Sequence, residues 1–293
     1  MNSFTISQLQ QFSGIKAHTI RMWEQRYNAL SPKRSEGNTR NYDNDQLRRL
    51  LNIVSLMDTG FKVSELCVMP DEKLFDLMEG QLKVTSASDR SGEYFISQLL
   101  AASMSFDEQH FEKIFSNCLL RNGMKNTYVK VVYPMLTRVG LMWTNNTMPP
   151  AHEHFISNLL RQKLFSAVDA LSPASNSTET WLLCLPEDEF HEIGLLLANF
   201  LLRQAGKKVI YLGANVPFGA LKSTELAIKP THLLLFWVHH LEPKAAQKYL
   251  DDLEACFQET TIVLAGHESI KSKLNESKNI HWIHSVESLE KLF

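Results

Sequence analysis

The stretch Ile20-Arg21-Met22-Trp23-Glu24-Gln25-Arg26-Tyr27 places two arginines and two aromatic residues on one short predicted helix. The segment before it begins with a capping-box pair, Thr5 and Gln8, and ends at Gly14, which predicts a first short helix. Two short helices joined by a glycine-containing turn form a helix-turn-helix unit, whose second helix enters the DNA major groove. The sequence therefore predicts a DNA-binding head.

Basic residues support this interpretation. Pro32-Lys33-Arg34 and Gly37-Asn38-Thr39-Arg40-Asn41-Tyr42 predict a turn-rich hairpin suited to phosphate contacts. Residues 16–49 carry eight Lys or Arg against four Asp or Glu, whereas the whole chain has a net charge of −2. Because phosphate neutralisation supplies most non-specific affinity, a local basic patch matters more than the total charge. A near-neutral chain argues against a general nucleic-acid coat or a membrane-surface protein.

Residues 4–66 resemble the MerR-type winged helix-turn-helix, in which Arg-x-Trp/Tyr-Glu-x-Arg-Tyr precedes a Pro-x-Arg wing and an Arg-x-Tyr. The matching residues are Arg21, Trp23, Glu24, Arg26, Tyr27, Pro32, Arg34, Arg40 and Tyr42. The resemblance implies a DNA-binding surface that consists of Arg21, Trp23, Arg26, Tyr27, Arg34, Arg40 and Tyr42. Trp23 has an alternative role, because it can simply pack against the first helix.

Length and composition set outer bounds. The 293 residues suggest two or three domains, and a hydrophobic content of 44% is ample for real cores. The N-terminus shows no apolar signal-peptide core, and no run of 18 apolar residues is present. The cysteines at 67, 118, 184 and 256 form no Cys-x-x-Cys pair, which indicates reduced, mostly buried thiols. We therefore expect a cytoplasmic protein without a membrane segment.

Three domains are expected: the head at 1–75, a four-helix cap domain at 90–172 and an α/β domain at 178–293. Small polar stretches at 81–89 and 172–178 read as linkers. The middle part has a helical pattern over 92–104, 107–122, 125–143 and 150–171, which predicts an antiparallel bundle.

From residue 180 the hydrophobic period changes, and short apolar runs alternate with helix-length segments. Strands are predicted at 180–185, 208–213, 232–238, 261–265 and 280–283, and helices at 192–205, 218–228, 243–257, 268–275 and after 286. This alternation predicts a doubly wound, five-stranded parallel sheet of the Rossmann-like type. Such sheets bind ligands beyond the carboxyl ends of their strands.

A candidate site falls at that edge. Glu189, His191 and Gly194 follow the first strand and resemble the cobalamin-binding Asp-x-His-x-x-Gly motif, with glutamate in place of aspartate. In that family the histidine coordinates cobalt and the carboxylate binds its other nitrogen, which fixes the tautomer and raises the basicity of the ligand. Gly213, in a Leu-Gly-Ala-x-x-Pro turn, is also typical of these domains. The alternative for His191 is an ordinary surface or capping histidine.

The bundle carries a related spacing. Trp143 is followed after nine residues by Glu153-His154, as in the cobalamin-dependent photoreceptor regulators, which join a MerR-type head, a bundle and a cobalamin domain. That resemblance implies that Trp143 shields the adenosyl side of the cofactor and that Glu153 and His154 contact the adenosyl group or the corrin. The alternatives are an ordinary core tryptophan that ends a helix and an exposed helical turn. A zinc site at His152 and His154 is disfavoured, because residues i and i+2 on a helix point apart.

Three departures from these families concern the cofactor. The third strand, Leu235-Phe236-Trp237-Val238, lacks the serine that usually lines the slot for the nucleotide tail of cobalamin, and Ala265-Gly266 stands for Gly-Gly. Thr144 replaces the histidine that follows the tryptophan in the photoreceptors. His239-His240 is a possible substitute ligand pair, although strand-edge histidines are the simpler interpretation.

We therefore expect a transcriptional regulator, not an enzyme, that senses a cobalamin such as adenosylcobalamin and controls its own oligomerisation and operator binding. No sustained heptad follows the head, so association is expected through the bundle and sheet domains as a dimer or tetramer. One alternative is a regulator with a degenerate cobalamin pocket that responds to a protein or another small molecule. A corrinoid carrier module of an enzyme is a further alternative, but it does not need the arginine pattern of the head.

Overall fold

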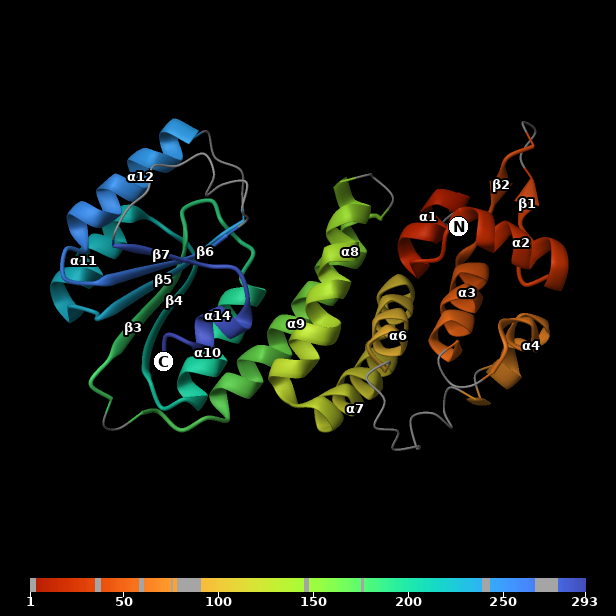
Figure 1. Ribbon diagram of the computed structural model, residues 1–293, viewed down its shortest axis with the longest axis horizontal. Helices are drawn as coiled ribbons and strands as arrows, with labels where there is room; N and C mark the ends of the chain where they lie inside the picture. Colours follow the sequence, from red (N-terminus) through yellow and green to blue (C-terminus); the bar gives the residue numbers. More distant parts are fainter. Residues whose placement is uncertain are drawn as a thin grey trace. The chain divides into compact units, whose positions relative to one another are not determined.

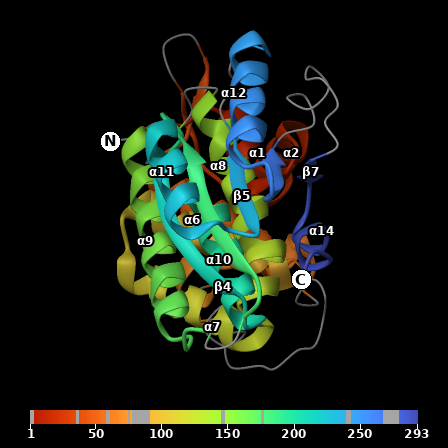
Figure 2. The same ribbon diagram turned by 90° about the vertical axis from the view of Figure 1, so that its left-hand side faces the viewer.

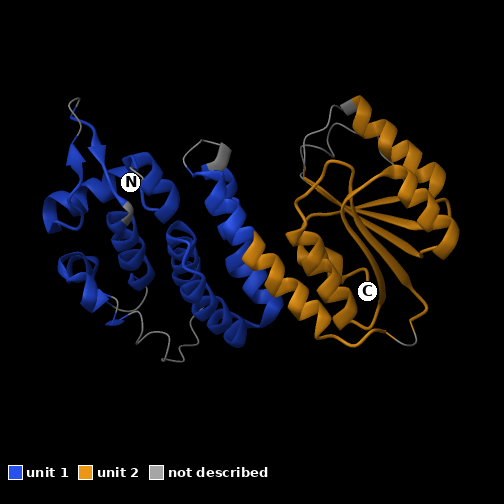
Figure 3. Ribbon diagram, turned by 180° about the vertical axis from the view of Figure 1, so that it is seen from behind, with its two compact units in different colours: residues 1–157 blue, residues 158–293 orange. Residues whose placement is uncertain are grey.

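The computed structural model describes residues 4–34, 38–57, 61–74, 76–77, 91–144, 148–174, 177–238, 243–266 and 279–293. The chain folds into two compact units, residues 1–157 and 158–293, and Figure 3 shows that the boundary falls inside helix α9 (Pro150–Asp169). The head and most of the bundle thus share one unit, a grouping different from the three expected domains. The predicted linker at 81–89 lies outside the described residues.

The head begins with the helix-turn-helix that the sequence predicts. Thr5 and Gln8 form the capping box of the first helix, and Gly14 ends that helix with a left-handed φ of 72°. The second helix ends at Asn28, which is also left-handed. The head elements are α1 (Ile6–Ser13), α2 (Ala17–Tyr27), the hairpin β1 (Lys33–Arg34) and β2 (Arg40–Asn41), α3 (Asn44–Leu56) and α4 (Val63–Val68).

The bundle follows the predicted helices closely. It consists of α6 (Ser91–Ser105), α7 (Glu108–Thr127), the π-helix η1 (Tyr128–Val132), α8 (Tyr133–Thr144) and α9. The break expected after residue 122 is a kink at Gly123, whose φ of 71° and ψ of 168° are not helical. Glycine is suited to this position, because it adopts positive φ without a steric penalty from Cβ.

The second unit is a five-stranded, fully parallel sheet in the order β4-β3-β5-β6-β7, which confirms the predicted doubly wound fold. Its strands are β3 (Thr180–Pro186), β4 (Lys208–Val216), β5 (His232–Trp237), β6 (Thr261–Gly266) and β7 (Ile280–Ile283). The helices are α10 (Ile193–Gln204), α11 (Phe218–Ile228), α12 (Pro243–Cys256) and α14 (Val286–Glu290). The helix predicted at 268–275 lies outside the described residues.

Alternating side chains of the buried strands fill two cores. Figure 1 shows α10 and α14 on one face of the sheet and α11 and α12 on the other, and Figure 2 brings α11 and α12 toward the viewer. Leu182 and Cys184 of β3 pack on the α11–α12 side, whereas Trp181 and Leu183 pack on the α10–α14 side. The order of strands reverses at β3, and ligands of such folds bind beyond the carboxyl end of the strand at this switch point.

Candidate functional site

The exposed basic surface of the head is formed by α2 and the hairpin. Arg21 and Arg26 on α2 and Arg34 on β1 are exposed, and Tyr27 is partly exposed at the end of α2. Arg34 is held by the side chain of Asn38, whose oxygen accepts a hydrogen bond of 2.5 Å from the guanidinium. These four residues are presented as the predicted DNA-binding surface requires.

Three other predicted DNA-binding residues support that surface from within. Trp23 and Tyr42 are 5% and 1% exposed, so both belong to the core of the head. Arg40 donates a hydrogen bond of 2.9 Å to Glu24 on α2, and the Tyr42 hydroxyl donates to the same carboxylate. Burial, followed by the bond to Glu24, raises the pKa of Tyr42, so its hydroxyl stays protonated. Arg40 and Tyr42 thus tie α2 to the hairpin through Glu24, and a contact of Tyr42 with DNA stays a prediction.

A residue that the motif did not single out braces the head. Arg49 on α3 donates to the carbonyl oxygens of Ala29, Cys67 and Met69 at 2.7 Å, 2.7 Å and 2.9 Å, and it pairs with Asp71. The guanidinium of Arg49 is therefore engaged by groups of the head itself. The number of Lys and Arg residues in 16–49 thus overstates the positive charge that is available to DNA. Only the folded chain brings these carbonyl groups together, so no local pattern identifies this role.

In the second unit, the carboxylate of Glu189 organises the segment after β3. The side chain is 2% exposed. One carboxylate oxygen accepts hydrogen bonds from the backbone N–H groups of Phe190 and His191 at 3.0 Å and 3.1 Å, and the other accepts from Val238 N–H at 3.0 Å. The first oxygen also lies 2.5 Å from Nδ1 of His191. A buried carboxylate with this many donors is rigidly held.

The His191 ring is oriented by that carboxylate. Its side chain is 57% exposed although its Nδ1 is held against a buried group. Since the carboxylate engages Nδ1, the atom that would coordinate a metal is Nε2, and a carboxylate behind a histidine is the usual support of such a ligand. The predicted pair of Glu189 and His191 is therefore brought together by the fold.

A second polar cluster lies beside this pair. Glu192, which directly follows His191 and precedes α10, accepts a hydrogen bond of 2.8 Å from the Tyr211 hydroxyl and forms a 2.6 Å ion pair with Arg161 on α9. Gly213 has a φ of 84°, and a Cβ at this position would lie 3.2 Å from the Glu192 carboxylate. Gly213 therefore leaves room for Glu192, while Gly194 lies in the first turn of α10. A cofactor-binding role for the two glycines stays a prediction.

The end of β5 lacks the serine that cobalamin-binding domains usually have there, and Trp237 occupies this strand end. Trp237 is 2% exposed and packs edge-on against Tyr249, with the ring centroids 5.6 Å apart. A Cβ at Gly266, its neighbour on β6, would lie 2.9 Å from the Trp237 carbonyl oxygen. The indole thus fills the core between the sheet and α12 at this strand end. His239 and His240 lie outside the described residues.

The predicted residues of the bundle are described within the first unit. Trp143 and Thr144 end α8, and their side chains lie outside the description. Glu153 on α9 accepts a hydrogen bond of 2.6 Å from the Ser157 hydroxyl, and its other oxygen lies 3.1 Å from Nδ1 of the exposed His154. Glu153 and His154 are thus brought together, and their contact with a cofactor stays a prediction.

Two kinds of metal site concern the described residues, a cluster of ligand side chains and the two histidines of a possible zinc site. Within the described residues no three His, Cys, Asp or Glu side chains form a group that could hold a metal ion by themselves. His152 is buried against the Ser103 carbonyl oxygen, in agreement with the argument against a zinc site.

The four cysteines are free thiols, three of them buried, and burial raises the pKa of Cys67 to about 11. In the part of the chain that the structure describes, no helix is long and apolar enough to cross a membrane.

Two family models match this chain, each over one part of it. Residues 4–68 match the MerR HTH family regulatory protein model, and residues 95–166 match the B12 binding domain model. The first match covers the head from its first described residue to the end of α4. The second covers the bundle from α6 into α9, the part that is predicted to be a cap domain, so it does not test the α/β domain at 178–293.

Two relatives are similar over most of the chain. The HTH-type transcriptional repressor CarH of Myxococcus xanthus is 29% identical over 78% of this chain and 76% of its own length. The repressor CarA of the same organism is 28% identical over 91% of this chain and 88% of its own. A solved cobalamin-binding protein from Desulfitobacterium hafniense aligns with 67% of this chain and 96% of its own, at 15% identity and a TM-score of 0.32, a likeness too weak to carry an argument. The chain is a DNA-binding transcriptional regulator that joins a MerR-type helix-turn-helix at residues 4–68 to a B12 binding domain at residues 95–166.

Proposed function

We propose that the regulator senses cobalamin directly, with His191 as the protein ligand of cobalt. The observation that carries the proposal is the hydrogen bond between Nδ1 of His191 and the buried carboxylate of Glu189, at the carboxyl end of β3. His191 would hold the cobalt through its imidazole, and Glu189 would support that imidazole.

The residues present fit a cofactor whose metal would take one histidine ligand from the protein. The exposed ring of His191 is backed by an acceptor that four donors hold in place, which is the preorganised support that a metal-ligating imidazole requires. The structure offers no such fit for a nucleotide tail at the end of β5, because the indole of Trp237 fills the core there. We therefore restrict the proposal to coordination by His191 and place no tail in the strand-end core.

The mechanism assigns each side chain one task. Glu189 accepts a hydrogen bond from Nδ1–H of His191. This bond selects the tautomer whose Nε2 carries the lone pair. Glu192 is held by Tyr211 and Arg161, and it fixes the backbone next to His191. When bound, cobalamin supplies a cobalt–carbon bond that light or chemistry can break. Trp143, Glu153 and His154 are proposed to contact its adenosyl group from the bundle.

The proposed output is a change in oligomeric state. Several heads held on one assembly raise apparent operator affinity without new base contacts, because the second contact becomes intramolecular. Adenosylcobalamin would favour the assembly, and its loss would release the operator. Thr144 stands where the photoreceptor regulators have a histidine. This departure concerns the response to light and not the binding of cobalamin, so the two are tested separately.

A visible absorption spectrum tests the core of the proposal. Purified protein is mixed with adenosylcobalamin in the dark, desalted and then illuminated. Retention of the corrin bands, and their loss or shift in His191→Ala with an unchanged circular dichroism spectrum, is the expected result. Light-altered bands in the wild type would extend the proposal to photoreception. Colourless protein after desalting would contradict it.

One specific observation favours a second candidate function. If the buried Trp237 closes the pocket, the second unit binds no corrin, and the regulator responds to a protein or another small molecule. The enzyme-module alternative has no such support, since the match to the MerR model covers the head and both relatives are named as transcriptional repressors.

A further inference from the structure

The DNA-binding head packs directly on the bundle within the first unit. Helix α3 of the head lies along α6 of the bundle, and α1 contacts α8. Near the second contact, Arg138 on α8 forms two hydrogen bonds of 2.7 Å and 2.6 Å with Glu93 on α6. The guanidinium of Arg138 lies 3.8 Å from the position of a Cβ at Gly14, in the turn of the helix-turn-helix.

A buried polar network crosses the contact between α3 and α6. Gln98 on α6 is 1% exposed. Its amide nitrogen donates to Ser55 and Asn52 on α3 at 2.7 Å and 3.2 Å, and its amide oxygen lies 3.0 Å from Nε2 of His110 on α7. One side chain thus connects the head to two helices of the bundle.

This network favours a single docked position. A buried amide that loses its partners pays the full cost of desolvation, so a shifted or rotated head would leave Gln98, Asn52 and Ser55 without the bonds seen here. Purely apolar contacts between two helices would tolerate such sliding far better. The polar residues therefore specify the orientation of the head more than they add to its affinity for the bundle.

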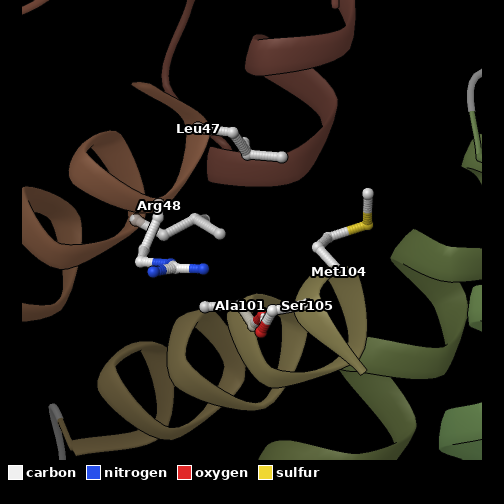
Figure 4. Close-up of a pocket in the computed structure, with 6 residues that line it drawn as sticks. Leu47, Arg48, Ala101, Met104 and Ser105 are labelled. Carbon is white, nitrogen blue, oxygen red and sulfur yellow. Dashed lines mark hydrogen bonds between the residues drawn. The ribbon is translucent and has the colours of Figure 1, made fainter. Parts of the chain in front are cut away.

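The crevice beside the network is a gap in this contact and not a ligand site. Figure 4 shows Leu47 and Arg48 of α3 facing Ala101, Met104 and Ser105 of α6 across it. Its empty volume is about 220 Å³, part of which is open solvent. Because the 220 Å³ includes open solvent, the enclosed space is far smaller than the roughly 300–1,000 Å³ of a small-molecule pocket.

Docking leaves the DNA-facing surface accessible. The head uses α3 and α1 for the contact, whereas Arg21 and Arg26 on α2 and Arg34 on the hairpin remain exposed. A docked head is therefore able to bind DNA, and the bundle controls where that surface points. From these observations we infer that the bundle orients the head through Gln98, so that paired heads meet their half-sites in a fixed geometry.

The same helix touches the first turn of α9. The Ser103 hydroxyl on α6 donates a hydrogen bond of 3.0 Å to the His152 carbonyl oxygen, and the His152 ring lies 3.1 Å from the Ser103 carbonyl oxygen. Phe106, just after α6, stacks on the His152 ring at 4.3 Å. Helix α6 thus joins the head to the turn that carries Glu153 and His154. That these two residues deliver the signal rests on the proposed function, whereas the orientation of the head does not.

The test compares Gln98→Leu with Gln109→Leu, a matched change on the exposed surface of α7. Amide hydrogen exchange of the full-length protein measures docking. We expect exchange in α3 and the facing part of α6 to be faster by roughly tenfold in Gln98→Leu, the order expected for one unsatisfied buried polar group, and unchanged in Gln109→Leu. Ser55→Ala removes the same bond from the head and covers the case in which Gln98→Leu fails to fold.

Operator binding measures orientation. On an operator selected from random duplexes by the wild-type protein, Gln98→Leu should lose roughly tenfold in affinity, while its affinity for a single half-site stays unchanged. Unaltered exchange in both Gln98→Leu and Ser55→Ala would overturn the docking contact. Faster exchange with the wild-type ratio of full-site to half-site affinity would overturn the orienting role. Neither readout uses cobalamin, so a colourless wild-type protein would contradict the proposed function and leave this inference to be decided on its own data.

Discussion

Replacement of Glu189 by glutamine separates the carboxylate from its role as support for His191. A glutamine that keeps its oxygen toward Nδ1 must turn its NH2 group toward the backbone N–H of Val238, where two donors then face each other. The bond lost there is 3.0 Å long and charge-assisted in the wild type, and such bonds contribute about 1.5–3 kcal/mol. We expect the second unit of Glu189→Gln to unfold at a correspondingly lower urea concentration.

The effect on ligand binding is expected to be similar in free energy to the effect on the fold. Changes in the group behind a metal-ligating histidine typically reduce metal affinity by about 10–100-fold, because the imidazole loses basicity and orientation. Cobalamin affinity of Glu189→Gln should therefore fall within this range in a visible-absorbance titration. The exposed Glu187→Gln is the control and should bind like the wild type. Wild-type affinity and an unchanged corrin spectrum in Glu189→Gln would refute the assignment of the pair.

Three further changes test other parts of the structure. Glu24→Ala leaves the buried Tyr42 hydroxyl without its partner and should destabilise the head by about 2–4 kcal/mol, measured by urea unfolding with operator binding as a second readout. Burial holds the pKa of His232 below its ordinary value of 6.5, so the unfolded chain binds the proton more readily and stability falls as pH drops below about 6.5. His232→Phe should flatten that decline in a series of unfolding curves between pH 5 and 8, while the nearby charged or titratable groups, Glu179, Lys207 and His281, remain. Trp237→Ser should lower the stability of the second unit by about 3–5 kcal/mol, and a gain in cobalamin affinity would show that the indole blocks the tail.

Most of the secondary structure could be predicted because its signals are local. The capping box of Thr5 and Gln8 and the stop at Gly14 both lie at the ends of one helix, and the structure has both features. The strands of the second unit are short apolar runs between helical segments, and their predicted and observed starting residues agree at all five strands. A local pattern needs no knowledge of which elements later meet.

The contacts that define roles in the head are not local. Glu24 meets Arg40 and Tyr42 across 16 and 18 positions of sequence, and Arg49 reaches Cys67 across 18. A motif records that an arginine is present, but its partner depends on how α2, the hairpin and α3 pack. For this reason the sequence predicts the DNA-binding head correctly, whereas it does not distinguish residues that face DNA from residues that brace the surface.

The candidate cobalt ligand shows the same division. Glu189 and His191 are two positions apart after one strand, so the sequence already predicts their hydrogen bond as part of a motif. The third partner of the carboxylate, Val238 N–H, follows β5 and is 49 positions away. The parallel order places the ends of β3 and β5 side by side, and only this topology supplies the donor. The position of Trp237 is likewise decided by the register of β5 with β6.

Helix α9 explains why the chain divides into two units and not three. Its first turn is bound to α6 through His152, and α6 is bound to the head through Gln98, so residues 150–157 belong with the DNA-binding half. Its later turns are bound to the second unit through the ion pair of Arg161 with Glu192, the residue after the candidate cobalt ligand. Helix α9 therefore carries contacts of both units, at His152 in its first turn and at Arg161 further along.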